Sequence, residues 1–502
     1  MRTRLLLTLL LLGACGTRRP THLPTMADAA LSPADDCAAF ASPELNARLD
    51  RRTRSQRTDG NAVDLLVDGV ESWARRVDNA RDADLILVKT FIYSDDEAGQ
   101  AVSSLLRARA RAGATVIVQY DMKGSLSGVG EVVSLYDASE SDRFFRDKPI
   151  LADMDKDGVI VVPTNVPKRG REARRFERAR TRLEPNATRV GLLTRLTGAR
   201  DFGNFDHEKY WITGHRGDDG QVTLAAILGG LNIASEYAYG RTPKVDAVTG
   251  RGGWRDTDIE ARGPVTLDIL ARYQDLLTLN APEAAARLRA EAWGTSQATA
   301  GTARVRFVWN QPALVEGRRI EHLFRELIAV VPTGGTVRLG MAYFTPGRRI
   351  RRPIEAHLRD AGKLAVLTNS FESTDMRLVV TGSRGAYQSL LKTSPSAALF
   401  EWLPRPDQGL STLHSKVASF GTCGPIIVGS ANMDGLSSEH NSESVLVVED
   451  AALRQRFDRM FDADIAQGSA QRVTEGTIGG TGPLVRWTQR GVYRWGWTWL
   501  SR

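Results

Sequence analysis

The chain has 502 residues, too many for one ordinary hydrophobic core, so we expect two domains. A composition of 42% hydrophobic and 25% charged residues excludes an intrinsically disordered chain and a protein that crosses a membrane many times. The net charge of +8 suits an anionic substrate or an anionic membrane surface, but it does not choose between lipid and nucleic acid.

The N-terminus has the pattern of a secretory signal, with two arginines before the short apolar run Leu5 to Leu12. The sequence Leu12-Gly13-Ala14-Cys15 resembles a bacterial lipobox, in which the cysteine becomes the lipidated first residue of the mature protein. We therefore predict a lipoprotein signal peptide over 1–15, lipidation of Cys15, and a tether and N-terminal segment over 16–59. The alternative is an ordinary cleaved signal with a chance cysteine.

The predicted anchor also indicates a location. Gly16, rather than Asp, follows the cysteine, which in Gram-negative lipoproteins implies sorting to the outer membrane. We therefore expect a lipid-anchored protein of the bacterial cell envelope, facing the periplasm. Cys37 and Cys423 would be the remaining cysteines, and they could pair in such an oxidising compartment.

A strand-helix-strand pattern begins near Asp82 and returns in the second half of the chain. The expected elements are 85–93, 99–112 and 115–120 in the first half, and 337–344, 350–361 and 364–367 in the second. Strand, helix and strand with short connections indicate α/β architecture, and the recurrence indicates an internal duplication. A stretch rich in small residues, 294–302, separates the halves, which predicts domains over 60–293 and 303–468.

An insertion over 122–204 and a tail over 469–502 stand apart from this pattern. The insertion carries a basic stretch, Lys168 to Arg182, which fits either a solvated helix face or a phosphate-binding patch. It also begins an EF-hand-like loop at Asp153, but Thr164 occupies the twelfth position where that loop needs Glu, so we expect a turn and no metal site. The tail is rich in Trp and Arg, which fits either contact with lipid headgroups or an alternating strand.

Two short motifs, one in each half, carry the residues for chemistry. They are His207-x-Lys209 and His414-x-Lys416, and a glycine-containing loop follows each of them and ends in Asn232 or Asn432. Residues two apart in a strand project from the same face, so each histidine and its lysine would point into one cleft. The glycine turn lets the backbone approach closely and brings the asparagine beside them.

Two such sets facing each other meet the needs of phosphodiester transfer. One imidazole attacks phosphorus and the other protonates the leaving alcohol, while the lysines and asparagines hold the remaining phosphate oxygens. This chemistry requires no metal, and we expect no cofactor.

The paired motifs resemble the signature of the phospholipase D superfamily, HxKxxxxD followed by a Gly-rich loop and Asn, and more specifically that of bacterial cardiolipin synthases. Further landmarks of the resemblance are Trp254-Arg255-Asp256-Thr257-Asp258, Tyr343-Phe344-x-Pro346, Asp375 and Asn441-x-Glu443. The resemblance implies two similar lobes, each a mixed β-sheet flanked by helices, with the active site at the lobe interface. It assigns a catalytic set of His207, Lys209, Asn232, His414, Lys416, Ser430 and Asn432, with Glu443 holding a catalytic histidine and Glu236 as its equivalent in the first half. The sequence does not show which histidine is the nucleophile, and family precedent favours His207.

The chain departs from the family signature at one position of each motif, because Gly214 and Gly421 stand where Asp is expected. The first hypothesis is an enzyme, a phosphatidyltransferase or phospholipase D that acts on anionic phospholipids at a membrane surface through a phosphohistidine intermediate. The acceptor could be water, glycerol or phosphatidylglycerol. The alternatives are a nuclease of the same superfamily, with nucleic acid as partner, and a non-catalytic phospholipid-binding lipoprotein, which the two glycines favour.

Overall fold

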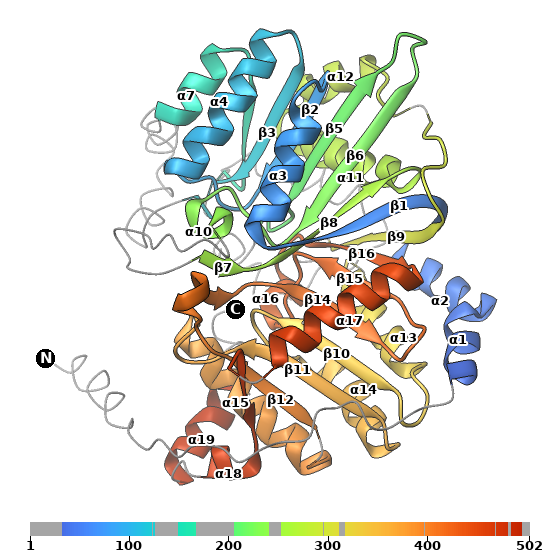
Figure 1. The fold of residues 1–502 in the computed structure, drawn as a ribbon, viewed down its shortest axis with the longest axis vertical. Coiled ribbons are helices and arrows are strands. Elements are labelled where there is room, and N and C mark those ends of the chain that lie inside the picture. Colours follow the sequence, from blue (N-terminus) through green and yellow to red (C-terminus); the bar gives the residue numbers. More distant parts are fainter. Residues whose placement is uncertain are drawn as a thin grey trace, which may run out of the picture. The chain divides into compact units, whose positions relative to one another are not determined.

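The chain folds around one 15-stranded mixed sheet to which both halves contribute (Figure 1). The computed structural model describes residues 33–122, 124–125, 149–166, 205–239, 253–294, 296–310, 317–395, 397–466, 468–479 and 483–493. The first half supplies β1 (Arg57–Val67), β2 (Leu85–Thr90), β3 (Thr115–Asp121), β4 (Ile160–Thr164), β5 (Tyr210–Arg216), β6 (Val222–Gly229) and β8 (Thr257–Arg262). The second half supplies β9 (Ala303–Trp309), β10 (Thr336–Met341), β11 (Lys363–Asn369), β12 (Ala398–Trp402), β14 (Lys416–Phe420), β15 (Ile426–Gly429), β16 (Ser444–Glu449) and β17 (Ala470–Val473). A separate two-stranded sheet pairs β7 (Gly253–Arg255) with β13 (Leu410–Leu413).

The strand order repeats outward from the centre of the sheet. On one side it runs β1-β8-β6-β5-β2-β3-β4, and on the other β9-β16-β15-β14-β10-β11-β12, with β17 added at the end. Equivalent neighbours also pair in the same sense; β2–β3 and β10–β11 are parallel, for example, whereas β5–β6 and β14–β15 are antiparallel. The antiparallel pair β1–β9 joins the two sets. The repeat has the pattern of the internal duplication that the sequence indicates.

Helices cover both faces of the first half of the sheet. The helices are α3 (Asp68–Ala80), α4 (Glu97–Arg111), α7 (Pro149–Lys156), α10 (Ser235–Ala238), α11 (Val265–Asn280) and α12 (Pro282–Ala290). Leu85 and Leu87 of β2 pack with α11 and α12, whereas Ile86 and Val88 pack with α3, α4 and α7. Because successive side chains of a strand point to opposite faces, a continuous apolar run such as this one needs cover on both sides.

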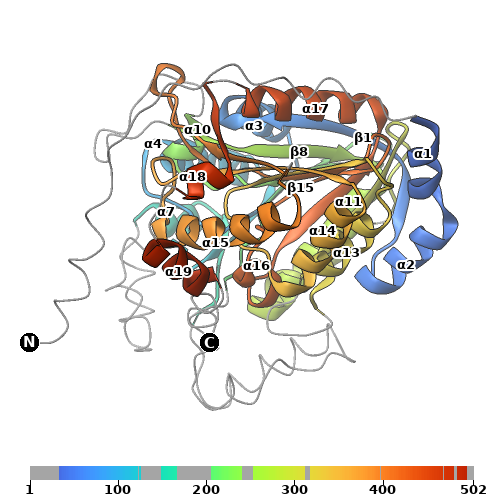
Figure 2. The same ribbon diagram turned by 90° about the horizontal axis from the view of Figure 1, so that it is seen from below.

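The second half is covered in the same way. Its helices are α13 (Arg319–Ala329), α14 (Arg348–Arg359), α15 (Arg377–Thr393), α16 (Gly435–Glu439), α17 (Ala451–Ile465), α18 (Glu475–Gly479) and α19 (Pro483–Gly491), with a short 3-10 turn, η3 (Pro406–Gln408). Val337 and Leu339 pack with α13, α14 and α15, whereas Val417 and Val428 pack with α17. Figure 2 shows α19 beside α15, to which it is tied by a hydrogen bond of 2.8 Å between Gln388 and Gln489.

The N-terminal segment is more structured than a tether. Helices α1 (Pro33–Ala41) and α2 (Pro43–Thr53) precede β1, and they place Phe40 and Leu45 in the core of the second half. Cys37 on α1 forms a disulfide with Cys423 in the connection between β14 and β15. The disulfide thus joins two segments that are 386 residues apart in the sequence.

The structure confirms the predicted α/β class and the strand-helix-strand elements, with shifts of a few residues at their ends. In the insertion, Asp153 lies in α7 and Asp157 bonds the guanidinium group of Arg111 at 2.6 Å. Within the described residues, no helix is both long and apolar enough to cross a membrane. Cys15, the basic stretch 168–182 and three tryptophans of the tail, Trp495, Trp497 and Trp499, lie outside the described residues, whereas Trp487 lies on α19 and is 72% exposed. The domain limits 60–293 and 303–468 stay a prediction.

Candidate active site

Both histidines lie where the two halves of the chain meet. His207 precedes β5 and His414 precedes β14, and these strands hold equivalent places in the repeated order. The backbone N–H of His207 donates to the carbonyl of Ser442 at 3.0 Å, and the N–H of His414 donates to the carbonyl of Arg255 at 2.7 Å. Each histidine is therefore tied through its backbone to the opposite half of the chain.

Each imidazole also contacts a carboxylate from the opposite half. Nδ1 of His207 lies 2.9 Å from a carboxylate oxygen of Glu443, and Nδ1 of His414 lies 2.7 Å from Asp256. Asp256 immediately precedes β8 and Glu443 immediately precedes β16, the equivalent strand. The two carboxylates are therefore counterparts in the duplication, and each half orients the imidazole of the other.

The partner of His414 differs from the residue expected from the family resemblance. Glu236 was expected in that place, but it lies half-buried in the short helix α10, and the carboxylate that hydrogen-bonds the His414 ring is Asp256. Asp256 belongs to the Trp-Arg-Asp-Thr-Asp landmark, and the sequence alone does not indicate its role. The signal that could have found it is its position: it directly precedes a strand, as Glu443 does in the second half.

The glycine loops allow this close approach. A Cβ atom on Gly230 would lie 2.1 Å from a carboxylate oxygen of Asp256, and one on Gly429 would lie 2.2 Å from the carbonyl oxygen of Ser444. Any larger residue at these places would displace the carboxylate or the neighbouring strand. The physical reason inferred for glycine from the sequence, close backbone approach, therefore applies at both loops.

The two asparagines at the loop ends are oriented in the same manner. The side-chain oxygen of Asn232 accepts from the N–H of Ile92 at 3.1 Å, and that of Asn432 accepts from the N–H of Tyr343 at 3.3 Å. Because the side-chain oxygen is fixed by this hydrogen bond, the amide nitrogen of each asparagine must point away from the backbone N–H that the oxygen contacts. The amide nitrogen of Asn232 is buried and has the phenol of Tyr237 as its neighbour, so a bound group that accepts from this nitrogen would replace that contact.

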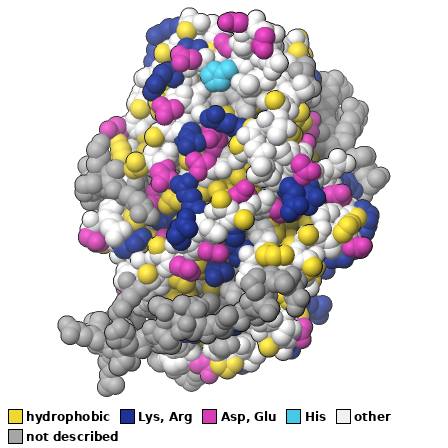
Figure 3. Space-filling view, turned by 45° about the vertical axis from the view of Figure 1, so that its right-hand side comes forward, with side chains coloured by type: hydrophobic (Ala, Val, Ile, Leu, Met, Phe, Trp, Pro, Cys, Tyr) yellow, Lys and Arg dark blue, Asp and Glu magenta, His cyan; other side chains and the backbone are white. Residues whose placement is uncertain are grey.

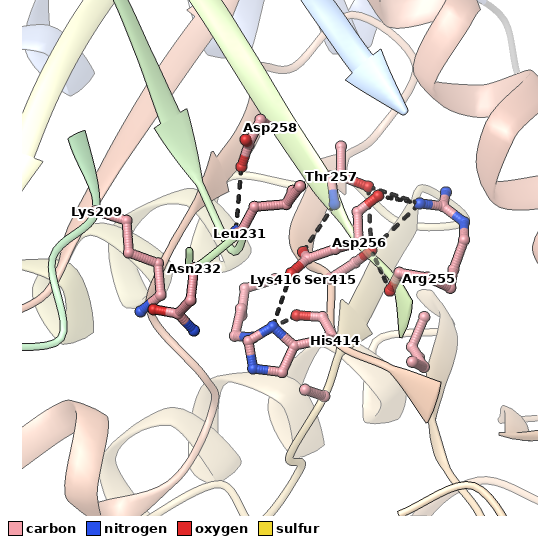
Figure 4. Close-up of polar contacts among 12 residues, drawn as sticks. Lys209, Leu231, Asn232, Arg255, Asp256, Thr257, Asp258, His414, Ser415 and Lys416 are labelled. Carbon is pink, nitrogen blue, oxygen red and sulfur yellow. Dashed lines mark hydrogen bonds and ion pairs between the residues drawn. The ribbon is translucent and has the colours of Figure 1, made fainter. Parts of the chain in front are cut away.

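The lysines share the site with both histidines, because each imidazole senses the charges of both lysines. Lys209 donates to the carbonyl of His207 at 2.8 Å, and Lys416 donates to the carbonyl of His414. Figure 4 shows Lys209 and Asn232, from the first half, beside His414 and Lys416, from the second. Two pairs of side chains that are distant in the sequence thus form one cluster.

The cationic groups of this cluster are less basic than usual. Burial lowers the pKa of Lys209 to about 7 and the pKa of Lys416 to about 8, against partial compensation by Glu443 and Asp256. Burial, followed by the charges of both lysines, lowers the pKa of both imidazoles well below the usual value. Because each group senses charges from both halves, the site is a single electrostatic unit.

Glu443 is the most heavily hydrogen-bonded of these carboxylates. It accepts from Ser437 at 2.7 Å, from Asn441 at 3.2 Å and from the hydroxyl of Ser430. Ser430, which the resemblance placed in the phosphate half-site, therefore orients Glu443. Burial nevertheless raises the pKa of Glu443 to about 7, with the charge of Lys209 acting in the opposite direction.

The residue between His207 and Lys209 faces away from them, as alternation along an extended chain requires. Glu208 is fully buried and forms an ion pair of 2.5 Å with Arg272 on α11. Tyr210 donates to the same carboxylate, and the Arg272 guanidinium lies 3.8 Å from the ring centroid of Trp309. This buried cluster fixes the backbone that carries the first His-x-Lys motif.

Gly214 and Gly421, which replace the signature aspartates, lie far from the cluster. Each is seven residues beyond its histidine, on the order of 20 Å along an extended strand. A Cβ atom on Gly214 would lie 3.1 Å from the ring of Trp293, and Gly421 adopts a φ of 55° directly after β14. Arg454 donates to the carbonyl of Gly421, so a different group stabilises the turn. The replaced aspartates therefore leave the His, Lys and Asn sets unaffected.

Aromatic rings surround the imidazoles, a feature that sequence reasoning did not assign. The ring centroid of Phe91 lies 5.0 Å from that of His207, while Trp254 and Tyr237 lie 5.0 and 5.1 Å from His414. They exclude water from the rings on these sides and help to explain why burial dominates the pKa shifts. On the face in Figure 3, acidic and basic side chains are interspersed, so the positive net charge is not gathered there. No cluster of metal-ligating side chains occurs among the residues that the structure describes.

The chain is similar in sequence and in fold to known proteins. Residues 333–465 match the family model described as "Cardiolipin synthase, PLD-like domain". Cardiolipin synthase B of Shigella flexneri is 24% identical over 418 residues, which cover 82% of each chain, and cardiolipin synthase C of Escherichia coli K12 is 27% identical over 294 residues, 48% of this chain and 59% of that one. The crystal structure of phosphatidylserine synthase from Haemophilus influenzae Rd KW20 superposes with a TM-score of 0.57 at 13% identity, over 89% of this chain and 97% of that chain.

Residues 333–465 are therefore similar in sequence to a phospholipase D-like domain, and the fold is similar to that of phosphatidylserine synthase. Over most of its length, the chain is also similar in sequence to the bacterial cardiolipin synthases.

Proposed function

We propose that the chain is a phosphatidyltransferase or phospholipase D that acts on the phosphodiester bond of anionic phospholipids through a phosphohistidine intermediate. The reciprocal arrangement of the imidazoles supports this proposal: Glu443 of the second half orients His207, and Asp256 of the first half orients His414. A hydrogen bond at Nδ1 fixes each ring and leaves Nε2 for chemistry. The cardiolipin synthases to which the chain is similar support the choice of a phospholipid substrate.

The first step transfers the phosphatidyl group to the protein. Nε2 of His207 forms a bond to phosphorus as the bond from phosphorus to the leaving alcohol breaks, and His414 gives its proton to the leaving oxygen. Glu443 stabilises the positive charge that develops on His207. The lowered pKa of His207 keeps this imidazole neutral and nucleophilic near pH 7.

The second step reverses the roles around the same phosphorus. His414 takes a proton from the acceptor hydroxyl, the acceptor oxygen bonds to phosphorus, and the bond from phosphorus to His207 breaks. Lys209, Lys416 and the amide nitrogen of Asn232 hold the non-bridging oxygens in both steps. The negative charge of the bound diester offsets the effect of the lysines on His414 and allows this ring to carry its proton.

Turnover of defined substrates tests this function. Purified protein is incubated with phosphatidylglycerol vesicles, with and without glycerol, and separately with plasmid DNA. The matched variants are His207→Ala, His414→Ala and, as a control outside the site, His215→Ala. We expect lipid turnover that is lost in the first two variants and kept in the third. Nicking of DNA without lipid turnover would support the nuclease, and no turnover of either would leave a phospholipid-binding protein.

The location of the protein is part of the same proposal. A lipid anchor at Cys15 would hold the enzyme at a phospholipid surface, and the disulfide between Cys37 and Cys423 fits an oxidising compartment outside the cytosol. Replacement of Cys15 by Ser should release the protein from the membrane fraction of a Gram-negative host. Retention of this variant with the outer membrane would contradict the proposed anchor.

A further inference from the structure

The two half-sites differ at the residue that orients the asparagine. Ile92 follows β2 and Tyr343 follows β10, the equivalent strand, and each donates its backbone N–H to an asparagine. The first half thus presents an apolar side chain, and the second presents a phenol. The hydroxyl of Tyr343 lies 2.8 and 2.6 Å from the two carboxylate oxygens of Asp375, in the segment between β11 and α15.

The Tyr343–Asp375 pair lies on the His414 side of the site. Burial lowers the pKa of Lys416 and raises that of Tyr237, and the charge of Asp375 adds a smaller upward contribution to both, so the carboxylate is within electrostatic reach of these two groups. The ring of Tyr237 is itself 5.1 Å from that of His414. Asp375 is exposed and Tyr343 is half-buried, which places the carboxylate toward solvent, where an incoming molecule can reach it.

We propose that Asp375, held by Tyr343, recognises a polyol acceptor and thereby favours transfer over hydrolysis. The inference rests on the proposed function, in which His414 deprotonates the acceptor. A polyol with its reactive hydroxyl at His414 carries a second hydroxyl that can donate to Asp375, whereas water has none. An ionised carboxylate accepts about four hydrogen bonds, so the contact with Tyr343 leaves room for this one. The positive charges of the two lysines oppose an acceptor that carries an ammonium group.

The partition between transfer and hydrolysis tests this inference. The full chain is incubated with phosphatidylglycerol vesicles and a range of concentrations of isotope-labelled glycerol, and labelled phosphatidylglycerol, the transfer product, is measured beside phosphatidic acid, the hydrolysis product. Asp375→Asn keeps the shape but loses the charge, and should lower the ratio of transfer to hydrolysis about tenfold, the effect of losing one hydrogen bond to a charged group. The lower ratio should be accompanied by a higher KM for glycerol. Tyr343→Phe, which frees the carboxylate, should lower the ratio less.

Glu372→Gln is the matched control, because Glu372 is an exposed carboxylate three residues away in the same segment. It should leave the ratio unchanged. An unchanged ratio in Asp375→Asn would overturn the inference while the proposed function stands, as would hydrolysis without any glycerol transfer in the unmodified protein. Ethanolamine used more readily than glycerol would also overturn it, because the recognised group would then be an ammonium. Absence of any phospholipid turnover would refute the proposed function and this inference with it.

Discussion

The ion pair between Glu208 and Arg272 offers a quantitative test of how the first motif is held. Both side chains are fully buried, and Glu208 lies between the two residues of the His-x-Lys motif. Arg272→Met leaves a buried carboxylate whose remaining hydrogen-bond partner is Tyr210. Breaking a buried pair by removal of one partner costs about 3–5 kcal/mol of unfolding free energy.

The double variant Glu208→Gln, Arg272→Met separates the pair from the packing of its members. It removes both charges, and the glutamine oxygen can still accept from Tyr210. We therefore expect the double variant to lose less stability than Arg272→Met alone, with a difference of about 2 kcal/mol or more. Urea unfolding monitored by circular dichroism measures both values, and residual phospholipid turnover in the folded variants reports whether the motif is still in register.

Equal loss of stability in the single and double variants would refute this reasoning. The cost would then come from the contact between Arg272 and the ring of Trp309, rather than from a carboxylate left without its cation. A variant Arg272→Met as stable as the unmodified protein would refute it more directly.

Three further predictions follow from contacts in the site and at the N-terminus. Asp256→Asn should lower kcat about a hundredfold with little change in KM, because the ring of His414 loses the carboxylate that stabilises its charged form, and steady-state kinetics of folded protein would show this. Affinity for an anionic diester, measured by inhibition, should fall as the pH rises through 7 to 8, because Lys209 has a pKa of about 7 and loses its proton there. Lys209→Arg should move this loss of affinity to higher pH. A loss of affinity on acidification would contradict the assignment. Cys37→Ser with Cys423→Ser should lower the thermal midpoint, with a loss of at most about 6 kcal/mol from the entropy of closing a 386-residue loop, and reductant should have no further effect on this variant.

Much of the fold could be predicted because local signals agreed with one another. The buried strand 85–90 is a continuous apolar run, the helix after it begins at an Asp96 cap that accepts from Gly99 at 2.9 Å, and Gly113 beyond its end adopts a φ of 97°. Such signals come from residues close in the sequence. The junction of the halves through β1 and β9 depends on pairing between residues about 250 apart, and no local pattern specifies it.

In the candidate site too, residues in short motifs could be predicted, whereas contacts between distant residues could not. The His, Lys and Asn residues were identified because their spacing repeats within short motifs. Asp256 was not assigned a role because its partner His414 is 158 residues away, and a buried carboxylate has no periodic signature. Ser430 was assigned to phosphate because the sequence does not show which way a side chain in a loop turns.

The exchange of carboxylates between the halves has a consequence for assembly. Either half expressed alone would present an imidazole without the carboxylate that orients it, together with a buried acidic group that has lost its imidazole partner. Turnover can therefore begin only when both halves have docked, and two separately expressed fragments should be inactive apart and recover activity when mixed. Catalysis in this protein thus reports directly on completed folding.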